Sequence, residues 1–146
     1  MNWFSLVTQW KILMTIACIG GIHIGHHRAG LQLLRPFLIN SAPPFVQGGG
    51  LLALGLIYSN YSYNGAVLSV ILNSLETHLS SSTFPIRFGG CFSLGLICMG
   101  SQKVEYYNKI RFFLMDESEA VCEAASYSIE LIMLGCGECA QLNELF

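Results

Sequence analysis

The sequence predicts an all-α protein, specifically an α-solenoid of helix–turn–helix repeats, and three observations carry this prediction. First, 53% of the 146 residues are hydrophobic and only 11% are charged, against about 25% charged residues in a typical soluble domain. Second, an apolar segment recurs in phase at Gly20, Gly55, Gly95 and Glu130, which lie 35, 40 and 35 residues apart. Third, more polar segments with helical periodicity follow these blocks. Repeats of this length are typical of helical solenoids, so we expect one domain over residues 1–146 with three to four repeats.

The first helix of each repeat is expected within residues 15–25, 49–60, 89–100 and 124–135. A glycine in a helix interior costs about 1 kcal/mol relative to alanine, so these glycines need a compensating role. Small residues form pairs four positions apart: Gly49 and Ala53, Gly89 and Ser93, and Ala124 and Ser128. The Gly55 and Gly95 column lies roughly 200° further around the helix. Each such helix therefore has small residues on two sides, as a helix between two close neighbours requires.

Helix ends and turns follow from the residues between the blocks. Gly25, Asn60, Gly100 and Gly135 suit the left-handed position that ends a helix. Second helices are expected over 64–79 and 104–115, where apolar residues recur at i, i+3, i+4 and i+7. Turns are expected at 40–44, 80–85 and 116–119, with Pro44 and Pro85 near helix starts. Asp116 is predicted to cap the last helix, with Glu119 three residues later.

Charge divides the chain into two parts. Residues 1–115 hold all seven Lys and Arg with two acids, a net charge of +5, and residues 116–146 hold seven acids and no base, a net charge of −7. The basic residues do not cluster, which argues against nucleic-acid binding. We interpret the acidic block first as a helix start and second as a surface for a partner.

Taken together, these motifs resemble the proteasome/cyclosome repeat. The resemblance rests on the stretches 21–26, 48–57, 89–96 and 123–129, and it extends from about Trp10 to the end. The structural repeat positions are Gly20, Gly25, Gly49, Gly50, Gly55, Gly89, Gly90, Gly95, Gly100 and Gly135. Glu130 and Asn60 depart from the glycine columns, and residues 1–9 match nothing in the pattern. Family members are several times longer and contain a closed ring of repeats, so we expect a partial chain forming an arc of such a ring.

The resemblance, which is closest to the larger of the two proteasome members, implies a function. It implies a non-catalytic scaffold in the base of the proteasome regulatory particle that supports ubiquitin-dependent protein degradation. The implied partners are the ATPase ring and ubiquitin-processing subunits, and the implied location is the cytoplasm and nucleus. A repeat subunit of the anaphase-promoting complex is an alternative. A small multi-helix membrane protein is an alternative of another class, although the apolar runs 12–22, 48–58 and 89–100 are shorter than the roughly 20 residues of a span.

Few residues suggest chemistry. His23, His26 and His27 are candidate metal ligands, but with only Cys18 nearby a polar turn is the preferred interpretation. Cys136 and Cys139 form a CxxC motif, which can be a redox pair or half of a zinc site. No second CxxC is found and no strand is expected before it, so a turn between helices is the preferred interpretation. Most of the six cysteines lie in apolar runs, and no convincing signal peptide precedes them, so we expect free thiols in a reducing compartment. No phosphate-binding loop, paired carboxylates or nucleophile beside a base is found, so we expect no enzyme activity, metal or cofactor.

Overall fold

The computed structural model describes residues 3–61, 69, 73 and 75–136, and in this part of the chain every regular element is helical. The α-helices are α1 (Trp3–Ile22), α2 (His27–Leu34), α3 (Pro44–Ile57), α5 (Phe84–Ile97), α6 (Val104–Ile110) and α7 (Glu119–Ile132). Two 3-10 helices, η1 (Arg35–Phe37) and η2 (Arg111–Met115), follow α2 and α6. Residues 75–79 are also helical; most of the helix expected over 64–79 lies outside the described residues. The predicted all-α class is confirmed.

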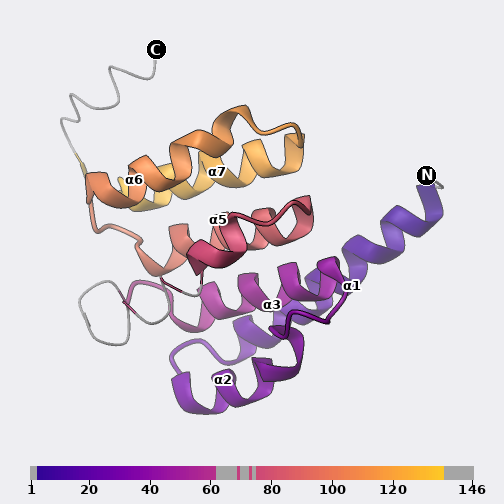
Figure 1. Cartoon of the computed structure of the whole chain (residues 1–146). Coiled ribbons are helices and arrows are strands. Elements are labelled where there is room, and N and C mark those ends of the chain that lie inside the picture. Colours follow the sequence, from indigo (N-terminus) through magenta and orange to yellow (C-terminus); the bar gives the residue numbers. More distant parts are fainter. Residues whose placement is uncertain (1–2, 62–68, 70–72, 74, 137–146) are drawn as a thin grey trace.

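The helices form two layers, as Figure 1 shows. In the first layer α3 packs between α1 and α5, and α5 packs between α3 and α7. In the second layer α2 packs against α3, and α6 with η2 packs against α7. The N-terminal part of α1 extends beyond the other first-layer helices (Figure 1), because α1 has 20 residues where α3, α5 and α7 have 14 each.

Proline and left-handed residues mark the ends of the first-layer helices. Pro44 opens α3 and Pro85 is the second residue of α5, where a missing N–H costs nothing because the first turn has no intrahelical acceptor for it. At the other end the chain turns through residues with positive φ, which glycine and asparagine adopt at low cost. These are Gly25 (φ 78°), Asn60 (56°), Gly100 (67°) and Gly135 (83°).

Two expectations about local structure are wrong. Residues 104–115 do not form one α-helix, because the α-helix ends at Ile110 and the chain tightens into η2. Nor does Asp116 cap α7. Ser118 occupies the cap position without a side-chain hydrogen bond, and the Asp116 carboxylate instead accepts the Ser118 N–H at 2.9 Å and hydrogen bonds from Arg87. An ion pair with a distant helix has replaced the local cap.

A continuous apolar core runs between the layers and along the stack. Leu51 and Ile57 of α3 and Leu94 and Ile97 of α5 are buried within it. At one edge the Trp10 ring lies edge-on to Phe45 (5.5 Å between ring centroids) and to Phe88 (5.0 Å). Such edge-to-face pairs add to the stabilisation that burial provides, so Trp10 fastens α1 to both α3 and α5.

Candidate functional site

The most distinctive feature of the described chain is a seam of small residues between neighbouring first-layer helices. In each contact, a glycine of one helix faces the backbone of a small residue in the next helix. That small residue lies two positions before the residue that is equivalent to the glycine in the repeat. The contacts are Gly20 with Ala53, Gly55 with Ser93, and Gly95 with Ser128. A Cβ on Gly55 would stand 2.5 Å from the Cα of Ser93, and one on Gly95 would stand 2.7 Å from the Cα of Ser128. The glycines therefore let the helix backbones touch.

The three consecutive glycines of α3 face three different neighbours. A Cβ on Gly48 would meet the carbonyl oxygen of Pro85 on α5, and one on Gly49 would lie 2.6 Å from the carbonyl oxygen of Leu13 on α1. A Cβ on Gly50 would lie 3.1 Å from the Phe37 side chain in the second layer. Successive residues of a helix point about 100° apart. Each glycine therefore leaves out a side chain on a different side of α3, and a different neighbour packs there. The triplet belongs to packing, not to a phosphate-binding loop.

Main-chain hydrogen bonds join the carboxyl ends of successive helices. The last carbonyls of a helix have no partner within it, and in this stack the turn after the preceding helix supplies donors. The N–H groups of Gly25, Asn60 and Gly100 donate to the carbonyls of Ile57 (3.2 Å), Leu96 (2.9 Å) and Leu131 (2.9 Å), respectively. The left-handed turns thus end one helix and satisfy the end of the next.

At the amino ends of the helices, Arg87 of α5 and Asp116 before α7 form a buried ion pair. The guanidinium donates through Nε and Nη2 to the two carboxylate oxygens, each at 2.8 Å, and through Nη1 to the Ser81 carbonyl at 3.0 Å. Burial raises the pKa of Asp116, but the hydrogen bonds from Arg87 and Ser118 and the Arg87 charge outweigh it, so the net pKa lies below its ordinary value. The pair holds the α7 start against α5.

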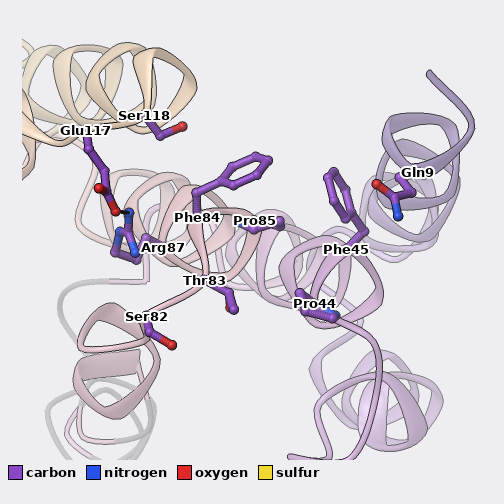
Figure 2. Close-up of a pocket in the computed structure, with 10 residues that line it drawn as sticks. All are labelled: Gln9, Pro44, Phe45, Ser82, Thr83, Phe84, Pro85, Arg87, Glu117 and Ser118. Carbon is purple, nitrogen blue, oxygen red and sulfur yellow. Dashed lines mark ion pairs between the residues drawn. The ribbon is translucent and has the colours of Figure 1, made fainter. Parts of the chain in front are cut away.

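A shallow pocket of about 650 Å³ lies beside this ion pair. Figure 2 shows Phe45 and Phe84 on its walls, Gln9 of α1 at one side, and Arg87 and Glu117 at the other. The Arg87 guanidinium is already paired with Asp116 and lies 3.6 Å from Glu117, so it has no spare charge for a ligand.

A second hollow, of about 450 Å³, is wholly apolar and crosses the first layer. Its walls come from all four first-layer helices, with Cys18 on α1, Leu56 on α3, Phe92 on α5 and Leu131 on α7. The repeat explains this continuity, because Leu56, Phe92 and Leu131 lie on the same side of their helices.

The structure separates the residues proposed for chemistry. His27 stacks on Tyr58 with ring centroids 4.6 Å apart, and His23 Nδ1 lies 2.9 Å from the Ile19 carbonyl. Within the described residues no three metal-ligating side chains come together. Cys136 is disulfide-bonded, so the expectation of free thiols is wrong for this residue, whereas Cys18, Cys91, Cys98 and Cys122 are free. Cys139, the other half of the CxxC motif, lies outside the described residues.

Buried thiols also lack reactivity. Cys91 and Cys98 are fully buried and free. Burial raises the pKa of each thiol to about 12, and the Asp116 charge adds to this for Cys91. Only the thiolate is a good nucleophile, so these two cysteines act as core residues. Among the helices that the structure describes, none combines the length and apolar character needed to cross a bilayer.

Sequence reasoning missed Arg87 and its ion pair with Asp116, which it had assigned to a helix cap. The available signal was a single arginine inside the apolar stretch 84–97, since a buried arginine needs an acceptor. Which acid supplies it could not be read from spacing, because Arg87 and Asp116 are 29 residues apart.

These features define a class: a helical-repeat protein whose helices contact one another through glycines. No family model matches the chain. It is, however, 30% identical to 26S proteasome non-ATPase regulatory subunit 1 of Drosophila melanogaster, in an alignment of 148 positions that covers 99% of the chain. The Caenorhabditis elegans protein of that name is also 30% identical over 99% of the chain, and regulatory subunit RPN2 of Saccharomyces cerevisiae is 28% identical over all of it.

The chain spans only a small part of these relatives, 14% of the Drosophila protein and 16% of the yeast protein. It is therefore homologous to one stretch of this proteasome subunit. The expected resemblance to the larger proteasome member, as a partial chain, is confirmed.

Proposed function

We propose that the chain is a non-catalytic scaffold segment of the proteasome regulatory particle and supports ubiquitin-dependent protein degradation. The observation that carries this proposal is the similarity of nearly the whole chain to non-ATPase regulatory subunit 1 of two animals and to regulatory subunit RPN2 of yeast. The names of all three relatives describe regulatory subunits, and those of the two animal proteins specify non-ATPase subunits. The proposed partners are ATPase-ring and ubiquitin-processing subunits, and the proposed location is the cytoplasm and nucleus.

The seam supplies a physical basis for a scaffold. Stacked repeats derive their stability from contacts between neighbours and present a long, rigid surface. We regard residues 1–146 as one domain of three to four repeats, in which the glycines from Gly20 to Gly135 named above are structural positions. Gly20, Gly55 and Gly95 bring helix backbones into contact, and Gly25, Gly100 and Gly135 supply the left-handed turns between helices, so a scaffold needs both sets for its shape.

Affinity purification tests this proposal. The tagged chain, expressed in eukaryotic cells, should co-purify with proteasome ATPase subunits, and the Gly55→Ala variant should co-purify less because it disturbs the stack. Gly21→Ala is the matched control, because a Cβ at Gly21 meets nothing within 4 Å. A wild-type chain that recovers no proteasome subunit would contradict the proposal, as would intrinsic turnover of a substrate by the purified chain.

A further inference from the structure

The pocket of about 650 Å³ described above follows a row of equivalent positions across the first layer. Three of its wall residues, Gln9 of α1, Pro44 of α3 and Phe84 of α5, are 35 and 40 residues apart, which is the spacing of the repeat. The next position in this row is Glu119, where α7 begins. The pocket therefore crosses successive helices, with Gln9 and Glu117 on opposite sides of it (Figure 2). This shape suits an extended segment of polypeptide.

The middle of the pocket is an apolar wall held in place by ring contacts. The rings of Phe45 and Phe84 meet edge to face with centroids 5.6 Å apart, and both contact Trp10, at 5.5 Å and 6.2 Å. Phe45 is buried and Phe84 is partly exposed, so Phe84 is the ring that a ligand reaches. Rings fixed in this way lose little further freedom when a ligand packs on them. The middle of the pocket therefore suits an aliphatic side chain.

The side of the pocket next to α7 carries unbalanced negative charge. The Arg87 guanidinium donates to both carboxylate oxygens of Asp116, so these two charges cancel. Glu117 remains, with its side chain 87% exposed, and exposed Glu119 follows it. Among the described residues Arg87 is the only Lys or Arg that lines the pocket. This side therefore attracts a cation and repels an anion.

The opposite side of the pocket lacks a hydrogen-bond donor. The amide oxygen Oε1 of Gln9 is buried and has no hydrogen-bond partner among the residues that the structure describes. A buried acceptor without a donor costs free energy. Rotation of the amide group turns this oxygen towards the pocket, where a main-chain N–H of a bound peptide can donate to it. Gln9 therefore favours a ligand that carries peptide groups.

We infer that this pocket binds an extended segment of a partner protein in which a basic residue lies close to an aliphatic one. The aliphatic side chain packs on Phe84, and the Lys or Arg side chain lies beside Glu117. Packed helices lie about 8–10 Å apart, and an extended chain advances about 3.3 Å per residue. The two side chains are therefore about three positions apart in the segment. This binding is independent of the proteasomal role proposed above.

Fluorescence anisotropy with the purified full chain tests this binding. The probe is the fluorescein-labelled peptide Gly-Lys-Lys-Gly-Leu-Leu-Gly-Lys-Lys-Gly, whose sequence is the same in both directions, so that either orientation of the bound segment is sampled. This peptide should bind saturably to the wild-type chain. Replacing its lysines with glutamates should weaken binding at least about fivefold, and so should replacing its leucines with serines.

Variants of the chain locate the site. Glu117→Lys replaces an attraction with a repulsion and should weaken binding of the leucine peptide about fivefold. Glu105→Lys is the matched control, because Glu105 is an exposed acid on α6 that does not line the pocket; this variant should bind as the wild type does. Phe84→Ser should weaken binding of the leucine peptide and leave that of the serine peptide unchanged. Far-ultraviolet circular dichroism verifies that each variant is folded.

Three results would overturn the inference. The first is a wild-type chain that shows no saturable binding of the leucine peptide. The second is equal binding of the serine peptide, which would reduce the contact to charge alone. The third is undiminished binding by Glu117→Lys, which would assign the peptide to another surface such as the apolar hollow.

Discussion

Gly55 of α3 lies directly against Ser93 of α5, with room for a hydrogen atom and not for a methyl group: a Cβ on Gly55 would stand 2.5 Å from the Ser93 Cα. This contact is one of three equivalent backbone-to-backbone contacts along the stack. A glycine in the middle of a helix lowers helix stability, so the packing that it allows with the next helix has to compensate.

Replacing Gly55 with alanine should therefore destabilise the protein although alanine is the better helix former. The added methyl group meets the backbone of Ser93, which can move only with its helix, so we expect a loss of about 2 kcal/mol. Gly21→Ala, on the exposed side of α1, should instead gain up to about 1 kcal/mol. Urea unfolding followed by circular dichroism measures both. Equal effects of the two substitutions would show that the close approach at Gly55 does not constrain the fold.

Ser128 and Ser93 occupy equivalent positions, but their hydroxyl groups differ. The Ser128 Oγ lies 2.8 Å from the Cys91 carbonyl and 2.6 Å from the Ala124 carbonyl, whereas the buried Ser93 Oγ has no hydrogen-bond partner among the residues that the structure describes. Ser128→Ala should cost about 1 kcal/mol, and Ser93→Ala should be neutral or stabilising, because it removes an unsatisfied polar group. Thermal unfolding of the two variants side by side provides the comparison; a greater loss for Ser93→Ala would refute this account.

The Arg87–Asp116 pair should make a large contribution to stability. Asp116→Asn leaves the Arg87 charge buried without its counter-ion, so we expect a loss of about 3 kcal/mol in the free energy of unfolding. Glu117→Gln is the matched control, because the Glu117 side chain is 87% exposed and lies 3.6 Å from Arg87. It should change stability by less than about 0.5 kcal/mol. Comparable losses in both variants would mean that the buried geometry is unimportant.

The same pair predicts how stability depends on pH. Because the pKa of Asp116 is lower in the folded chain than in the unfolded chain, its contribution is complete above the unfolded value of about 3.9. The contribution disappears as the pH falls through the lower folded value. We expect the free energy of unfolding of the wild type to exceed that of Asp116→Asn at about pH 7. This difference should become smaller as the pH falls towards about 3. An advantage that is constant across this range would contradict the assignment.

Thiol labelling should distinguish the cysteines by position. Cys18 is exposed on α1, whereas burial raises the pKa of Cys91 and Cys98 to about 12. Iodoacetamide at mildly alkaline pH should modify Cys18 in the native chain and reach the two buried thiols only after unfolding. Peptide mass spectrometry locates the label. Labelling of Cys91 in the native chain as fast as Cys18 would show that the α5 core opens readily.

Several structural features followed from local sequence. Glycine is unfavourable inside an apolar helix unless packing requires it, and it recurs inside α1, α3 and α5. Prolines at the starts of α3 and α5 admit few alternatives, so the all-helical fold class was predictable. The predicted capping role of Asp116 was wrong because a distant side chain intervened. Aspartate commonly caps helices, yet the Asp116 carboxylate finds a stronger partner in Arg87, which lies 29 residues away in the sequence.

The sequence by itself determined that helices recur in phase with small residues on two sides, because periodicity and residue size are local properties. Only the tertiary structure decided which neighbour each small residue meets. The sequence shows three identical residues at positions 48–50, but in the structure Gly48 faces α5, Gly49 faces α1 and Gly50 faces Phe37. It also decided that Glu130 lies at an exposed end of the described stack. The physical reason is that packing partners come from chain segments brought together by folding, and their identity depends on how whole helices fit.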